Sequence, residues 1–158
     1  MPRIEEQIDI NAARADVFRF CHDFTNRPEW DEQVLGVELI TPKPVRQGTL
    51  LRFDSKSGNS IFSWEAEYTH YQMLQGSTLK AIDTASASPF ARGSVMTWEF
   101  DSTGSGTRMT WVWDYKPRGF IASIVDVLGR RSATHRAIKR SMQNLKSLVE
   151  AGRRASIN

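Results

Sequence analysis

Aromatic side chains at every second position are the feature of this chain that most constrains its fold. They occur in two neighbouring segments and are Trp98, Phe100, Trp111, Trp113 and Tyr115. Side chains two residues apart lie on the same face of a β-strand. Both segments are therefore predicted to be strands with one aromatic face.

An earlier segment repeats the pattern, with Phe62, Trp64, Ala66 and Tyr68 on one strand face. If the three strands pair in the register that aligns these faces, the sheet carries a wall of eight aromatic side chains. Two interpretations stay open. Buried Trp and Tyr have polar tips that need partners, so a wall around a void suits a ring-containing ligand. Alternatively, the same side chains fill a closed core.

Length and composition predict a single globular domain. The 158 residues, 40% of them apolar and 25% charged, are enough to bury roughly 70% of the unfolded surface. We expect this domain to span residues 1–152 and to be followed by a flexible tail at 153–158. No segment approaches the roughly 20 apolar residues of a membrane span, and residues 1–11 lack the apolar core of a signal peptide. We therefore expect a cytoplasmic protein.

The residue types that bind metals and cofactors are sparse. A single cysteine, Cys21, excludes an internal disulfide and argues against a zinc cluster. Because apolar residues such as Phe18 surround it in the sequence, we interpret it as a buried, inert thiol. His22 and His70 have no second histidine at metal-ligand spacing. Neither a phosphate-binding loop nor a nucleophile elbow is present, so we expect no metal and no other cofactor.

Basic residues are concentrated toward the end of the chain, where Glu150 is the one acidic residue among them. They are Arg130, Arg131, Arg136, Lys139, Arg140, Lys146, Arg153 and Arg154. Such a stretch could contact an anionic membrane surface, a protein or nucleic acid. A solvated helix face is the interpretation we favour, because an apolar stripe accompanies the charges. Nucleic acid is a disfavoured partner, and membrane contact stays open as a minor alternative.

Turn residues divide the first two thirds of the chain into short elements. A strand at 3–10 precedes a helix at 12–21 and a second short helix near Pro28, which suits a first helical turn. Further strands are predicted at 34–40, 49–54, 61–69, 79–85, 94–101 and 107–116. Their short connections imply an antiparallel meander.

From 120 to 151 the apolar period becomes that of a helix. One predicted stripe contains Phe120, Ile124, Val127, Ile138, Met142, Leu145 and Val149. Gly129 interrupts the stripe and is expected to kink the helix or divide it in two. We expect the stripe to pack on the sheet.

This order of elements is the helix-grip arrangement, and several short motifs fit it. They are Ile8-Asp9-Ile10-Asn11-Ala12, Asp16-Val17-Phe18, Pro28-Glu29-Trp30-Asp31, Gln47-Gly48-Thr49, Gly106-Thr107-Arg108-Met109-Thr110 and Leu145-Lys146-Ser147-Leu148-Val149-Glu150. Over nearly its whole length the chain resembles the START-like (SRPBCC) superfamily, and within it the polyketide cyclase/dehydrase-like group. The resemblance implies an α+β fold, in which a curved antiparallel sheet wraps around a long C-terminal helix. It also implies a mostly apolar cavity for lipids, polyketides or other hydrophobic molecules, but it supplies no universal catalytic motif.

Polar residues on inward faces are the remaining candidates for chemistry. Arg131 projects within about 20° of the centre of the apolar stripe, with Thr134 and His135 roughly 50° to either side. An inward guanidinium could bind a carboxylate, enolate or phenolate, and His135 could act as an acid or base. Glu6, on the face of Ile4, could pair with Arg131 inside the cavity. Alternatively, Gly129 shifts the register and Arg131 reaches solvent.

We therefore predict a domain that binds a small hydrophobic or aromatic molecule between the sheet and the C-terminal helix. The predicted ligand-binding residues are Trp64, Tyr68, Trp98, Trp111, Trp113, Arg131, Thr134 and His135. A polyketide cyclase or dehydrase is the enzymatic alternative, for which no catalytic residue is assigned. A membrane-surface or protein-interaction module that uses the basic helix is a third possibility.

Overall fold

A computed structural model describes residues 1–157, with the side chains of Ala122, Asp126 and residues 153–157 left out of the description. Its seven strands form one antiparallel sheet in the order β1-β7-β6-β5-β4-β3-β2. The strands are β1 (Arg3–Ile10), β2 (Val34–Leu39), β3 (Leu50–Ser57), β4 (Ser60–Gln72), β5 (Gly76–Thr84), β6 (Val95–Ser102) and β7 (Thr107–Asp114). The predicted meander of strands is confirmed.

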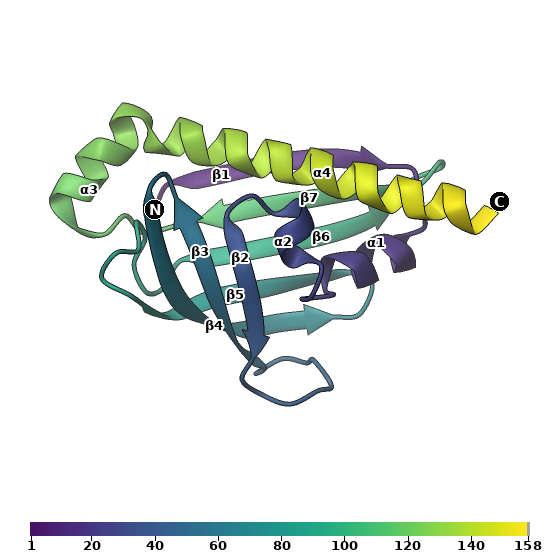
Figure 1. Cartoon of the computed structure of the whole chain (residues 1–158), viewed down its shortest axis with the longest axis horizontal. Helices are drawn as coiled ribbons and strands as arrows, with labels where there is room; N and C mark the ends of the chain where they lie inside the picture. Colours follow the sequence, from purple (N-terminus) through teal and green to yellow (C-terminus); the bar gives the residue numbers. More distant parts are fainter. Residues whose placement is uncertain (158) are drawn as a thin grey trace.

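Helical segments occur in two places, between β1 and β2 and after β7. Two short ones, α1 (Arg14–Cys21) and α2 (Arg27–Trp30), connect β1 to β2. After β7 come α3 (Gly119–Val125), a π-helical turn η1 (Asp126–Arg130) and the long α4 (Arg131–Ile157). Figure 1 shows α4 crossing the sheet, with α1 and α2 below it and α3 at the opposite end from the C-terminus. The predicted helix-grip architecture is confirmed.

The predicted aromatic wall is present and mostly buried. Pairing of β6 with β7 places Trp98 opposite Trp111 and Met96 opposite Trp113. Trp64, Trp98 and Trp111 are all buried, and Trp113 is partly exposed. The strand period in the sequence thus identified one continuous face of the sheet.

Cys21 is also buried, and burial raises the pKa of its thiol.

The predicted apolar stripe of the last helix is wrong for its first part. Ile138, Met142, Leu145 and Val149 are buried as expected, and α4 packs mainly along β1 and against α2. Phe120, Ile124 and Val127, by contrast, are exposed to solvent. The physical reason lies at Gly129, whose extended backbone (φ 168°) interrupts the helix and changes its direction. The division of the helix at Gly129 is therefore confirmed.

Helix α4 continues to Ile157, and Asn158 lies outside the described residues. A flexible tail was expected at 153–158. The side chains of 153–157 and the whole of Asn158 lie outside the description, so this tail stays a prediction. Within the described part of the chain, no helix combines the length and the apolarity that crossing a membrane requires.

Replacing Gly106 by alanine is expected to lower the free energy of unfolding by about 2 kcal/mol, the cost of overpacking a close contact. Gly106 lies in the β6–β7 turn, and a Cβ there would overlap the backbone carbonyl oxygen of Ile10 and crowd the amide of Ala12. Gly104 in the same turn has nothing within 4 Å of the corresponding position. Urea denaturation should show a clear loss for Gly106→Ala and almost none for Gly104→Ala. Equal losses would contradict the close approach of β1 to this turn.

Candidate functional site

A cavity of ≈ 70 Å³ lies between the aromatic face of the sheet and the first turns of α4. Its wall contains six aromatic side chains, which are Phe62, Trp64, Phe90, Trp111, Trp113 and Tyr115. The apolar remainder comes from Val34, Pro89, Met96 and Ile138. Polar groups are contributed by Arg27, Asp31, Gln33, Ser55, Lys56, Ser57, Arg130 and Thr134. The predicted void thus exists at one end of the wall, whereas the rest of the wall is closed core.

Trp64 and Phe90 make the aromatic part of the wall rigid. Phe53 stacks on Trp64 at a ring-centroid distance of 4.4 Å, and the Trp64 indole Nε1 donates to the hydroxyl of Ser55 at 3.0 Å. Phe90, from the β5–β6 loop, meets Trp64 and Trp113 edge to face at 5.2 and 5.0 Å. Edge-to-face and stacked pairs fix ring orientation in addition to burying area. The cavity wall is therefore preorganised.

Arg27 is a charged residue in the interior of the domain. Its side chain is 3% exposed, and both Nε and Nη2 lie 2.7 Å from Oδ2 of Asp31. Aromatic rings surround the guanidinium, with Trp98 and Trp30 at 4.5 and 5.0 Å from its carbon. Trp111 completes this cage at 5.8 Å. The carboxylate and the ring faces together compensate a charge that would otherwise be costly to bury.

Contacts with α4 hold α2, and therefore Arg27, in place. The backbone amide of Glu32 donates to the hydroxyl of Ser141 at 3.0 Å, and Asn144 donates to the carbonyl of Trp30 at 3.3 Å. On the surface, Arg140 binds both carboxylate oxygens of Glu32 at 3.0 and 2.9 Å. The last helix thus positions a charged group that belongs to a distant part of the sequence.

Three indole N–H groups near this cage lack a hydrogen-bond acceptor among the described residues. They belong to Trp30, Trp98 and Trp111. The three rings lie close together, with centroids between 5.5 and 6.1 Å apart. A buried donor without an acceptor costs about 1–3 kcal/mol. Because Trp111 also lines the cavity, a ligand oxygen could accept from its Nε1.

Four of the predicted site residues line the cavity, namely Trp64, Trp111, Trp113 and Thr134. Tyr68 and Trp98 do not line it. They pack around His22 on the side of α1, with ring centroids 6.2 and 5.4 Å from the imidazole. The prediction that they face a ligand void is wrong, because α1 covers that part of the sheet and fills the space.

Arg131 and His135 do not face the cavity, which agrees with the alternative in which Gly129 shifts the register of the helix. Arg131 is exposed, and its Nη2 donates to the backbone carbonyl of Arg3 at 2.9 Å. His135 Nε2 lies 2.6 Å from Oε2 of Glu6 at the edge of the domain. Glu6 therefore pairs with His135, where a partnership with Arg131 was expected. The break at Gly129 rotates the start of α4, so that Thr134 faces the cavity in their place.

Sequence reasoning missed the buried ion pair and the loop that closes the cavity. Arg27 and Asp31 are four residues apart, a spacing shared by exposed ion pairs on helix surfaces. Their spacing therefore does not reveal their burial. Phe90 lies in a turn-rich connection, and the one available signal was an aromatic residue among small and polar ones. Within the described part of the chain, no group of three or more potential metal ligands is found.

A curled antiparallel sheet that grips a long helix and leaves an aromatic cavity defines the START-like class of protein. A family model described as polyketide cyclase / dehydrase and lipid transport matches residues 1–150. The chain therefore belongs to this family, which confirms the resemblance found in its sequence. A proposed polyketide cyclase from Streptomyces cyaneus is 24% identical over 140 residues, which cover 86% of this chain and 90% of the relative.

Solved structures show the same fold at low sequence identity. The protein TTHA0849 from Thermus thermophilus superposes with a TM-score of 0.79 at 18% identity, over 96% of this chain and 99% of the other. The Zhui aromatase/cyclase from Streptomyces sp. R1128 gives a TM-score of 0.77 at 14% identity, over 94% of this chain and 93% of the other. At such identities the likeness concerns the fold.

Proposed function

We propose that the protein binds a small aromatic molecule that carries an oxygen acceptor, with the rings against the aromatic wall. The observation that carries this proposal is the buried Arg27 beside the cavity, together with the unpaired Nε1 of Trp111 on the same wall. An apolar pocket with a few convergent polar groups is the usual form of a small-molecule site. The family and the named aromatase/cyclase structure support a ligand of this kind.

The size of the cavity limits how the ligand enters. Its ≈ 70 Å³ is about half of the ~150 Å³ that accommodates benzene in an engineered protein cavity. Binding therefore requires some of the lining side chains to move. Arg130 and Thr134 are suited to this, because both are only partly buried and follow the break at Gly129. The rigid wall formed by Trp64 and Phe90 would then remain in place.

The polar groups of the site favour an oxygen acceptor over a ligand that is wholly apolar. The Asp31 carboxylate already balances the charge of Arg27, so a neutral carbonyl or phenol would not leave a net charge buried. Trp111 Nε1 would gain its missing acceptor. A hydrogen bond to an otherwise unpaired donor discriminates strongly against an analogue that lacks the acceptor. We therefore expect 2-naphthol to bind more tightly than naphthalene.

Filling the cavity from α4 is expected to weaken binding of 2-naphthol by about tenfold or more, since overpacking and loss of space together exceed about 1.4 kcal/mol. The change is Thr134→Phe, which places a ring in the void. Quenching of tryptophan fluorescence on titration measures the affinity, because Trp64 and Trp111 line the cavity. Ser132→Phe is the matched control on the exposed surface of the same helix and should bind as the wild type does. Similar affinities for wild type and Thr134→Phe would contradict this site.

A polyketide cyclase or dehydrase is the second candidate function. The guanidinium of Arg27 at the cavity wall could stabilise an enolate of a β-keto substrate, the role first considered for Arg131. The Asp31 carboxylate beside it is a candidate proton acceptor. Incubation with a linear poly-β-ketoacyl thioester and mass spectrometry for a dehydrated product separates the two functions. Product formation that exceeds the spontaneous reaction supports the enzyme, and tight binding without product supports a carrier.

A further inference from the structure

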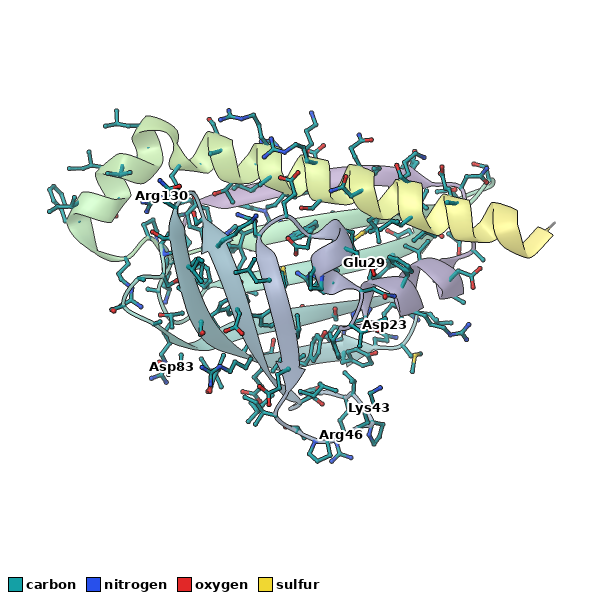
Figure 2. All side chains as sticks on the ribbon, in the orientation of Figure 1. Asp23, Glu29, Lys43, Arg46, Asp83 and Arg130 are labelled. Carbon is teal, nitrogen blue, oxygen red and sulfur yellow. The ribbon has the colours of Figure 1, made fainter. Side chains whose placement is uncertain are left out.

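The segment from Phe120 to Leu128 is the most exposed apolar part of the described chain. Phe120, Val127 and Leu128 are 81%, 84% and 80% exposed, and Ile121 is 78% exposed. Ile124 and Val125 add to the same surface. Figure 1 shows α3 beyond one end of the sheet, and in Figure 2 the side chains of this helix project away from the body of the protein. Clustered large apolar side chains of this kind mark an interaction surface.

Basic residues border this apolar segment. Residues 116–140 contain seven Lys and Arg residues and one acidic residue, Asp126. Lys116, Arg118, Arg131 and Arg136 are exposed. Arg118 donates to the carbonyls of Thr84 and Ala85, and Arg131 donates to the carbonyl of Arg3. These acceptors are neutral, so the hydrogen bonds do not balance the positive charges of the two arginines. Among the described side chains, no carboxylate lies within 4.0 Å of these basic groups.

Farther along α4, two of the basic side chains that the structure describes are paired with carboxylates. Arg140 is paired with Glu32 at 2.9 Å, and Lys146 with Glu150 at 2.8 Å. Among the described basic side chains of α4, those without a carboxylate partner therefore lie in its first part, close to the exposed apolar side chains. Apolar side chains that insert between lipid chains, with cations beside them at the headgroups, are the combination by which interfacial helices bind anionic bilayers.

We propose that the surface formed by residues 116–136 docks on an anionic lipid bilayer. The side chains of Phe120, Ile121, Val127 and Leu128 enter the interface, and Arg118, Arg131 and Arg136 contact the headgroups. Arg130 lies two residues after the apolar segment and lines the cavity, and in Figure 2 it lies by the β3–β4 turn. Docking therefore brings the Arg130 side of the cavity close to the lipid surface. The proposal stands whether or not the cavity holds the ligand proposed above.

Co-sedimentation with vesicles tests this docking. We expect the full chain to bind vesicles of phosphatidylserine and phosphatidylcholine, to bind pure phosphatidylcholine weakly, and to dissociate at high salt. The triple variant Phe120→Ser, Val127→Ser, Leu128→Ser should lose about tenfold or more of this affinity, because its apolar area no longer enters the interface. Its fold should be retained, since these side chains are exposed.

A second triple variant controls for the loss of any exposed apolar side chains. Leu35, Ile40 and Met73 are 45%, 45% and 63% exposed and lie outside the docking surface, so their replacement by serine should leave vesicle binding unchanged. Failure of the wild type to bind anionic vesicles would overturn the proposal, as would equal losses in the two variants. Light scattering supplies the other decisive result. A wild-type dimer that the first variant converts to a monomer would assign the surface to a second copy of the chain.

Discussion

Replacing Asp31 by asparagine is expected to lower the free energy of unfolding by about 3–5 kcal/mol. The change leaves the Arg27 guanidinium buried, at 3% exposure, without its carboxylate partner at 2.7 Å. The aromatic cage would remain, but ring faces compensate a full charge only in part. Asparagine keeps an oxygen that can accept from the amide of Gln33, now 3.0 Å from Oδ1, so the loss reports mainly the ion pair. Urea denaturation measures it as a shift in midpoint.

A double substitution separates the net contribution of the ion pair to the free energy of unfolding from the loss caused by removing one partner. Arg27→Met combined with Asp31→Asn removes both charges, and such replacements are often neutral or stabilising. We therefore expect the double variant to recover most of the stability lost by Asp31→Asn. Glu32→Gln is the surface control, because the Arg140–Glu32 pair is 57% and 34% exposed and is worth about 1 kcal/mol at most. A loss in Asp31→Asn no larger than that of Glu32→Gln would contradict the buried placement of the pair.

The architecture was predictable because it rests on a period in the sequence. Aromatic residues two apart, such as Trp111 and Trp113, define a strand face whatever their neighbours are. The same reasoning identified the buried stripe of α4 from Ile138 onward. It failed for Phe120 and Val127, because extrapolating a helical period across Gly129 assumes a straight helix.

The candidate site was less predictable, because it depends on which side chains are buried together. Arg131 fell near the centre of the projected stripe and yet reaches the carbonyl of Arg3 at the surface. Arg27 gave no periodic signal and yet lies in the core, held by a carboxylate four residues later and by rings from distant strands. Burial of a charge depends on these long-range partners, and a single sequence does not show which strand brings them.

His22 is expected to make the protein less stable in mild acid. Its ring stacks on Phe18 at 4.1 Å and is partly buried among Tyr71, Trp98 and Phe100. Burial lowers the pKa of His22 to about 4, an effect that a hydrogen bond to the carbonyl of Phe18 opposes and the nearby charge of Arg27 reinforces. The folded protein therefore holds a neutral imidazole.

The two hydrogen bonds of the ring define its tautomer. Nδ1 lies 2.8 Å from the carbonyl oxygen of Phe18, which can only accept, so Nδ1 carries the proton. Nε2, 2.8 Å from the hydroxyl of Ser77, then accepts from that hydroxyl. Protonation of Nε2 would turn an acceptor into a donor and would introduce a charge into an aromatic cluster.

The sign of the pH effect follows from these states. Above the pKa of about 6.5 that histidine has in an unfolded chain, neither state binds the proton, and the full stability is present. Between that value and about pH 4 the unfolded chain is protonated and the folded protein is not, so the free energy of unfolding falls by about 1.4 kcal/mol per pH unit. The total is about 3 kcal/mol at most, since the ring keeps some contact with water. The hydrogen bond from Arg108 lowers the pKa of Asp9, so the ion pair between these two residues is lost at a lower pH still.

Substitution of His22 by phenylalanine should remove this dependence. His22→Phe loses two hydrogen bonds, so we expect it to be less stable than the wild type at about pH 8. The difference in the free energy of unfolding between the two proteins should shrink as the pH falls toward about 4. In the wild type alone, protonation of residue 22 stabilises the unfolded chain and so lowers the free energy of unfolding. Urea denaturation at a series of pH values measures both curves, with His70→Asn as the control at an exposed histidine. Parallel curves for wild type and His22→Phe would mean that the imidazole is solvated enough to titrate normally in the fold.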